Sequence, residues 1–233
     1  MKKINELKVG VIISMYDEHE YVYSSIVNIK KTFNEPKFVV IHSDNGSEFN
    51  FNCVDTYVLL DNLAPTVERI KLPAHAVCRN LSRGFKEMDR FECDIVVVLF
   101  GDTHVVDAKS IYRRYAEMCQ NDFKIFVTRP LTQMMHGADG TLWSRQVTPH
   151  NWDFMGSLFF VNGEFLHESK VFQDIEVCNE YTSEQCLGDE LAKKLKDKSK
   201  VGVLNWINPS IYHSYTDGIN WQMYGAGENR KNG

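Results

Sequence analysis

Residues 94–104 read D-I-V-V-V-L-F-G-D-T-H and form the strongest strand pattern in the chain. A short, uninterrupted apolar run of this kind is typical of a strand that is buried on both faces of a parallel sheet. The run leads directly into Gly101 and Asp102, so a carboxylate follows the strand at once. Because ligands of open α/β sheets bind beyond the carboxyl ends of the strands, this stretch predicts both a central strand and a site.

The chain before this stretch alternates between strand and helix patterns. Apolar runs over 9–14 and 38–42 predict two more buried strands, and the segment between them carries apolar residues at helical spacing. This alternation predicts an α/β fold with a mostly parallel central sheet flanked by helices on both faces. The other patterns predict strands over 54–60, 124–128, 157–161 and 201–206, and helices over 74–88, after Asp107 and around 187–195.

Composition narrows the class of protein. The 233 residues include 43% hydrophobic and 24% charged residues, which is the composition of a folded globular chain. The 26 basic and 31 acidic residues give a net charge of −5, and no basic stripe predicts nucleic-acid binding. No apolar stretch approaches the roughly 20 residues of a transmembrane helix.

The cysteines and the N-terminal sequence indicate the cellular compartment in which the protein is located. The six cysteines include no C-x-x-C pair, which favours reduced thiols over a disulfide framework or a zinc site. The charged residues 1–8 lack the apolar core of a signal peptide. We therefore expect a cytoplasmic protein.

Several common site motifs are absent from the sequence. There is no G-x-G-x-x-G after the first strand and no G-x-x-x-x-G-K-[ST], which disfavours a dinucleotide-binding domain and excludes a P-loop NTPase. There is also no G-x-S-x-G or H-E-x-x-H. The remaining candidate for a functional residue is Asp102. Mg²⁺ and Mn²⁺ prefer carboxylate oxygens, and proteins hold a metal-bound diphosphate through only one or two carboxylates. A cation could therefore bridge Asp102 and a diphosphate. The alternative is an aspartate that only serves a turn.

A set of short motifs occurs in a fixed order between about residues 9 and 200. The motifs are V-I-I-S-M-Y-D-E at 11–18, S-D-N-G-S at 43–47, R-N at 79–80, L-F-G-D-T at 99–103 and G-D-E-L-A-K-K-L at 188–195. With these motifs in this order, the chain resembles a family 2-type glycosyltransferase of the GT-A fold. Glycosyltransferases of this kind transfer a sugar from a nucleotide donor.

The resemblance implies a donor site at the ends of the first strands. Asp44 would contact the base or ribose, unless it only forms an Asx-turn. Arg79 would reach the base or the diphosphate, unless it forms a surface ion pair. In the expected 74–88 helix, the apolar residues share a face that leaves out Arg79 and Asn80. The remaining expected donor contacts are Ser14, Tyr16, Glu18, Gly101 and Asp102.

The resemblance also implies a divalent cation, Mn²⁺ or Mg²⁺. Asp102 matches the last aspartate of the D-x-D motif, whereas Phe100 replaces the first one. His213 is the second expected ligand, since enzymes of the GT-A fold often bring a C-terminal histidine back to the metal. His104 is a further candidate. Both histidines have a purely structural alternative.

For catalysis, the resemblance implies an aspartate in an E-D-x-E-L pattern that opens a late helix. Asp189 matches that aspartate and is the expected general base, with Glu190 in reserve and Gly188 in place of the first Glu. The alternative is that acidic residues simply favour a helix N-terminus.

The segment 130–152 contains two prolines and two glycines and shows little periodicity, which predicts a long functional loop. Trp143, Trp152 and Asp153 lie in or beside it and are the expected acceptor contacts, unless the loop buries its own tryptophans. We interpret residues 1–233 as a single domain, with the donor-binding part at about 1–129 and the acceptor-binding and catalytic part at about 130–233.

The resemblance therefore implies an inverting glycosyltransferase that uses a UDP-sugar and a glycan hydroxyl acceptor. Its partners would include a membrane surface or a larger chain. The replacements at Phe100 and Gly188 favour an alternative, a domain that binds a nucleotide sugar or glycan without turnover. A sugar nucleotidyltransferase is disfavoured, because Met15 to Glu18 lack the expected glycine- and arginine-rich loop.

Overall fold

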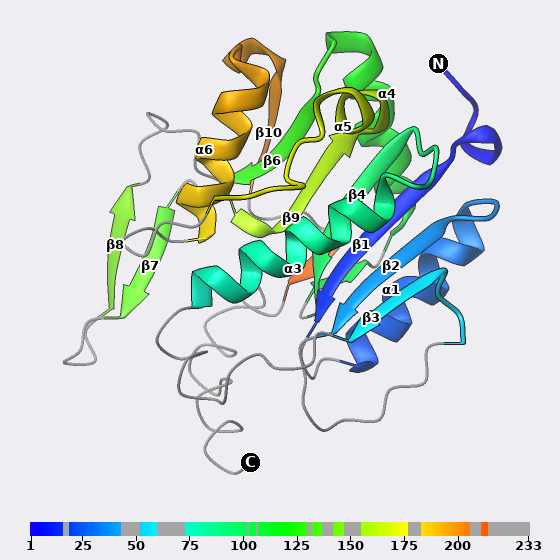
Figure 1. Ribbon diagram of the computed structural model, residues 1–233, viewed down its shortest axis with the longest axis horizontal. Helices are drawn as coiled ribbons and strands as arrows, with labels where there is room; N and C mark the ends of the chain where they lie inside the picture. The colour runs from blue at the N-terminus through cyan, green and yellow to red at the C-terminus, as the bar shows by residue number, and fades with distance from the viewer. Residues whose placement is uncertain are drawn as a thin grey trace.

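The centre of the molecule is a seven-stranded sheet with the strand order β10-β6-β9-β4-β1-β2-β3 (Figure 1). The computed structural model describes residues 1–15, 19–42, 52–59, 73–101, 103–105, 107–129, 132–136, 142–146, 155–176, 183–205 and 211–213. The strands of this sheet are β1 (Val9–Met15), β2 (Lys37–His42), β3 (Thr56–Leu59), β4 (Ile95–Phe100), β6 (Ile125–Arg129), β9 (Met155–Asn162) and β10 (Val201–Asn205).

The predicted fold class is confirmed. The two strongest apolar runs, β1 and β4, are parallel neighbours in register from Val9↔Ile95 to Ser14↔Phe100. β2 and β3 continue the sheet in parallel, and β10 is parallel to β6. Only β9 runs against its neighbours in this sheet, since it pairs antiparallel with both β4 and β6. The sheet is therefore mostly parallel, with one reversed strand near its middle.

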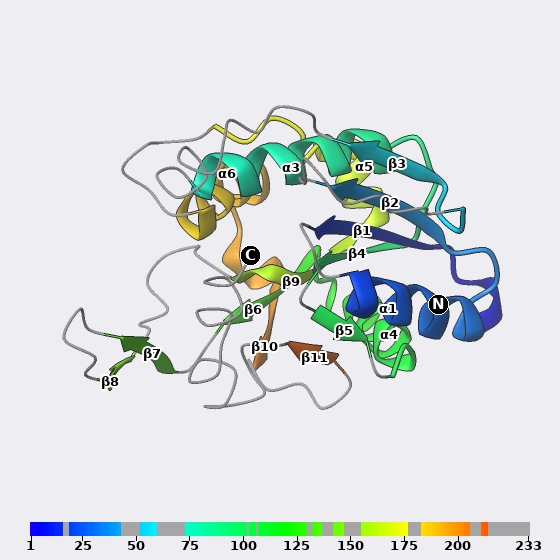
Figure 2. The same cartoon turned by 90° about the horizontal axis from the view of Figure 1, so that it is seen from below.

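Helices cover both faces of the sheet, as Figure 2 shows from below. The apolar stripes of α1 and α4 pack on one face, and those of α3, α5 and α6 pack on the other. Within the described ranges, no helix is both long and apolar enough to cross a bilayer. The helices are α1 (His19–Thr32), α3 (Pro73–Met88), α4 (Lys109–Asn121), α5 (Gly163–Ser169) and α6 (Ser183–Leu195), with short 3-10 turns at Ile4–Glu6 and Lys198–Lys200.

One glycine sets how closely α3 approaches the sheet. A Cβ atom added at Gly84 would lie 2.5 Å from Ile12 Cγ2, closer than two such atoms can approach. Gly84 therefore lets the helix backbone lie directly against β1. This close approach positions the residues of α3 that precede Gly84 over the end of β1.

Several short elements differ from the sequence-based expectations. The segment 130–152 was expected to be one loop, but it contains β7 (Thr132–His136) and β8 (Leu142–Gln146), which form a separate antiparallel two-stranded sheet. β5 (Thr103–Val105) and β11 (Ile211–His213) form another two-stranded sheet, and α5 follows β9 directly. These elements are short, so their own sequence carries little periodicity.

The β7–β8 hairpin lies on an excursion from one edge of the main sheet. Because β9 is antiparallel to both β4 and β6, β6 ends at the same edge as β4, and β9 begins there. The chain between Arg129 and Met155 therefore leaves and re-enters the sheet at its carboxyl edge (Figure 1).

Candidate functional site

The carboxyl ends of β4, β1 and β2 meet at one edge of the sheet. Ser14 is the register partner of Phe100, and Met15 is the register partner of His42. The N–H of Gly101 donates a hydrogen bond to the carbonyl oxygen of Ser14 at 2.8 Å. The structure thus brings together two expected donor contacts, Ser14 and Gly101, that are far apart in the sequence.

Other expected donor contacts lie outside the described residues. Tyr16 and Glu18 follow the end of β1, Asp44 follows His42, and Asp102 follows Gly101. The described residues just before these segments lie at the carboxyl edge, where Met15 pairs in register with His42 and Ser14 with Phe100.

Asn80 corrects one sequence-based expectation. It was placed off the apolar face of its helix, but it is only 4% exposed. Its Nδ2 donates a hydrogen bond to Ser14 Oγ at 3.1 Å, and this bond makes the burial of a polar side chain tolerable. Asn80 therefore ties α3 to the end of β1. Arg79, the next residue toward the N-terminus, is exposed.

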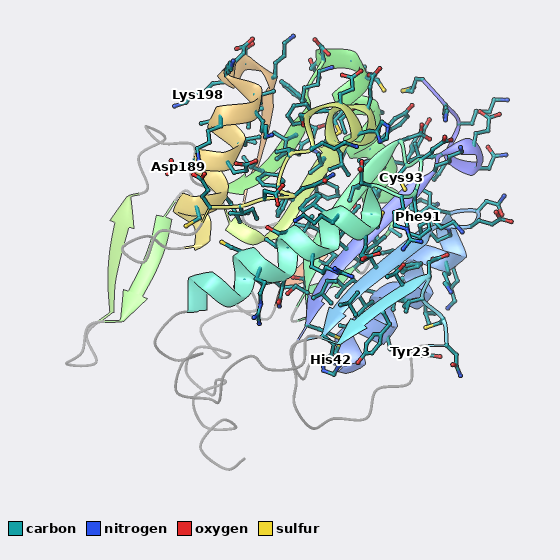
Figure 3. The ribbon with its side chains drawn as sticks, in the orientation of Figure 1. Tyr23, His42, Phe91, Cys93, Asp189 and Lys198 are labelled. Atoms are coloured by element: carbon teal, nitrogen blue, oxygen red, sulfur yellow. The ribbon has the colours of Figure 1, made fainter. Side chains whose placement is uncertain are left out.

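His42 is a residue of this edge that sequence reasoning did not single out. Its side chain is fully buried at the end of β2, and its Nδ1 lies 2.5 Å from the hydroxyl oxygen of Tyr57 on β3. Figure 3 shows His42 at the carboxyl end of its strand. A histidine that ends an apolar run directly before Ser43 and Asp44 is the signal that could have identified it.

The pairing of β11 with β5 brings a distant part of the chain to the edge. His213 is the register partner of Thr103, and Tyr212 is the partner of His104. Thr103 directly follows Asp102 in the sequence. The backbone of His213 therefore lies beside the segment that carries Asp102, although more than a hundred residues separate the two.

The residue types at this place fit a divalent cation. A carboxylate from Asp102 and an imidazole from His213 are both ligands that Mn²⁺ accepts, and Mg²⁺ accepts the carboxylate. Within the part of the chain that the structure describes, no three His, Cys, Asp or Glu side chains gather into a metal site.

The two acidic residues proposed for catalysis lie on different sides of α6. Asp189 is exposed (Figure 3), whereas Glu190 is 5% exposed. Burial raises the pKa of the Glu190 carboxyl, although Lys194 and Lys193 oppose that rise. The expectation that Asp189 opens its helix is wrong, because α6 already begins at Ser183. Helix-terminus preference therefore does not account for an acid at position 189.

The expected acceptor residues belong to the excursion between β6 and β9. Trp143 lies in β8 as the register partner of Met135 in β7. Trp152 and Asp153 lie outside the described residues. The hairpin is a sheet of its own and extends beside the carboxyl edge in Figures 1 and 2.

Comparisons with known proteins support the fold. No protein-family model matches the chain, and no curated protein sequence does. Among solved structures, TarS of S. aureus aligns with a TM-score of 0.50 and 13% identity over 86% of this chain and 36% of the TarS chain. The similarity defines a fold class, the GT-A-like α/β domain that the sequence predicted.

Two further structures align somewhat less well. TarS 1–349 in complex with UDP gives a TM-score of 0.48 and 12% identity over 85% of this chain and 58% of that chain. The 4-diphosphocytidyl-2C-methyl-D-erythritol synthase of Anaerococcus prevotii gives a TM-score of 0.48 and 9% identity over 97% of this chain and 100% of that chain. The present chain thus spans less than two thirds of either TarS chain.

Proposed function

We propose that this chain is an inverting glycosyltransferase that moves a sugar from a nucleotide-diphosphate sugar to a hydroxyl group of a glycan. The donor is a UDP-sugar, and the cofactor is Mn²⁺ or Mg²⁺. The observation that carries the proposal is the convergence at the carboxyl edge. Ser14 and Gly101 are hydrogen-bonded there at 2.8 Å, and β11 places the backbone of His213 beside Thr103.

In the reaction, one bond forms and one breaks at C1 of the sugar, and one proton is transferred. The acceptor oxygen forms a bond to C1 of the sugar while the bond from C1 to the diphosphate oxygen breaks. Asp189, which is exposed on α6, takes the proton from the acceptor hydroxyl. A cation held by Asp102 and His213 would stabilise the charge on the departing nucleoside diphosphate.

The remaining roles concern binding. Arg79 is exposed on α3, next to the Asn80 that is bonded to Ser14, and its guanidinium suits contact with the base or diphosphate. Trp143, Trp152 and Asp153 contact the acceptor from the excursion. Aromatic faces pack well against sugar rings, which favours this assignment.

The proposal is tested by measuring the melting temperature with a panel of nucleotide sugars, with Mn²⁺ and again with EDTA. A donor at about 100 times its Kd stabilises the folded state by about 2.7 kcal/mol, a rise of about 5–10 °C for a domain of this size. The rise should disappear in EDTA. A panel without any metal-dependent rise contradicts the proposal.

The metal ligand is tested by Asp102→Ala. Since the carboxylate is a proposed ligand, this variant should lose the metal-dependent part of the melting-temperature rise. The matched control is Asp174→Ala, which removes an exposed carboxylate paired with Lys86 and should keep the full rise. Equal metal dependence in both variants would show that Asp102 does not bind the cation.

The general base is tested by Asp189→Asn. Loss of a general base slows a reaction by about 10²- to 10⁴-fold. We expect that loss in sugar transfer, measured by product formation, while the donor-induced melting-temperature rise stays. The control here is Glu92→Gln, which changes an exposed carboxylate paired with Lys8 at 3.6 Å. If Asp189→Asn is fully active and Glu190→Gln is not, Glu190 is the base.

The same assays separate the alternatives. Donor binding without hydrolysis or transfer to any acceptor would identify a binding domain. Release of pyrophosphate from a nucleoside triphosphate and a sugar phosphate would identify a nucleotidyltransferase.

A further inference from the structure

Two polar side chains of α1 bind the backbone of β5. Ser25 Oγ accepts a hydrogen bond from the N–H of Val105 at 3.0 Å and donates one to the carbonyl oxygen of Thr103 at 3.3 Å. Asn28 Nδ2 donates to the carbonyl oxygen of Val105 at 2.9 Å. Ser25 and Thr103 are each 1% exposed, so water does not compete for the serine bonds.

All three of these bonds fall on the same edge of β5. They use backbone groups of Thr103 and Val105 and none of His104. Since backbone groups alternate in direction along a strand, those of His104 face the other edge, where Tyr212 of β11 is its register partner. β5 is therefore held between α1 and β11, as Figure 2 shows.

Thr103 is connected to both residues that are proposed to bind the cation. Asp102 precedes it in the sequence, and His213 is its register partner. β5 has only three residues, and an isolated two-stranded sheet is marginally stable at best in water. The hydrogen bonds from α1 must therefore contribute to fixing this segment.

We propose that Ser25 and Asn28 are positioning residues for Asp102 and His213, an inference that rests on the metal site of the proposed function. Removing the Ser25 hydroxyl takes a partner from the buried N–H of Val105, and a buried N–H must be paired again. The backbone of β5 then shifts, and both ligands move with it. Some residues orient metal ligands without binding the metal themselves. Replacing such a residue typically lowers metal affinity by about 10- to 100-fold.

The test measures free Mn²⁺ by electron paramagnetic resonance during titration of the protein with saturating UDP. We expect Ser25→Ala and Asn28→Ala to weaken Mn²⁺ binding by about 10-fold or more. The control is Thr32→Ala on the same helix. Its Oγ1 donates to the carbonyl oxygen of Asn28 at 3.0 Å and makes no bond to β5, so Mn²⁺ affinity should not change.

Amide hydrogen exchange gives a second readout. The amide of Val105 should exchange faster in Ser25→Ala than in Thr32→Ala, because it has lost its acceptor. If Ser25→Ala does not fold, Asn28→Ala decides, since it removes one donor from a half-buried position.

The outcomes separate this inference from the proposed function. Mn²⁺ binding in Ser25→Ala and Asn28→Ala as tight as in Thr32→Ala would overturn the positioning role and leave the metal site standing. A wild-type protein that binds no Mn²⁺, or an Asp102→Ala variant that binds it fully, would overturn the metal site and this inference with it.

Discussion

At the residue scale, the neighbours Asp189 and Glu190 show how a helix separates two carboxylates. Successive residues of an α-helix point about 100° apart. Glu190 therefore joins Leu187 and Leu191 on the buried side of α6, while Asp189 faces solvent. The desolvated Glu190 has a raised pKa, with Glu176 and Asp174 adding to the rise. An ionised Glu190 thus costs folding free energy.

This difference predicts a pH-dependent stability change in Glu190→Gln. Below the ordinary pKa of 4.5, the carboxyl is protonated in both the folded and the unfolded chain and carries no penalty. The penalty grows as pH rises above that value and is complete above the folded-state pKa. At pH 8 the variant should melt higher, by about 2–4 °C if the penalty is about 1 kcal/mol, and at pH 4 the gain should vanish.

Asp189→Asn is the control for this melting series, because the exposed carboxylate should leave the melting temperature unchanged at both pH values. A Glu190→Gln variant that is less stable than the wild type at pH 8 would mean that the buried carboxylate is stabilising after all.

The site was only partly predictable residue by residue. Ser14 and Gly101 follow from the rule that ligands bind beyond strand ends, and the structure joins them through one hydrogen bond. Asn80 was misplaced because a polar residue gives no apolar signal, although its bond to Ser14 allows it to be buried. Ser25 was missed for the same reason, since its partners on β5 are distant in the sequence.

At the element scale, the contact of α3 with β1 depends on Gly84. In an exposed helix, alanine would be about 1 kcal/mol more favourable than glycine. Here the added Cβ would meet Ile12 Cγ2 at 2.5 Å, and overpacking of a core costs about 1–3 kcal/mol. We expect Gly84→Ala to lower the free energy of unfolding, measured in urea.

The matched test combines Gly84→Ala with Ile12→Leu. Leucine has no Cγ2 branch, so alanine at position 84 should cost less in the double variant than alone. A Gly84→Ala protein as stable as the wild type would show that α3 does not need the close approach.

Long apolar elements were easier to predict than short polar ones. β1, β2 and β4 appear in the sequence as uninterrupted apolar runs because both of their faces are buried. β5, β7, β8 and β11 owe their structure to a partner strand elsewhere in the chain, and that pairing leaves no local pattern. The antiparallel direction of β9 could not be predicted from its sequence either, since a buried strand has the same composition in either direction.

At the scale of the whole molecule, two apolar layers stabilise the described part of the chain, in which no cysteine is cross-linked. One layer joins α1 and α4 to the sheet, and the other joins α3, α5 and α6 to its opposite face. The cysteines of the described residues, Cys53, Cys78, Cys93, Cys119 and Cys186, are all free thiols.

We therefore expect the same melting temperature with and without dithiothreitol. No described thiol contributes a cross-link, so reduction has nothing to break in the two layers. Differential scanning calorimetry of freshly prepared protein checks this. A fall of several degrees in the reductant would reveal a disulfide that stabilises the fold.

The reversed direction of β9 affects how the protein can evolve. The chain leaves the sheet after Arg129 and returns to it at Met155 on the same edge, so the residues between them are inserted at that edge. Under the proposed function, replacing this insertion would change which acceptor is bound and leave the ends of β4, β1 and β2 unchanged. Acceptor specificity could then evolve independently of donor binding.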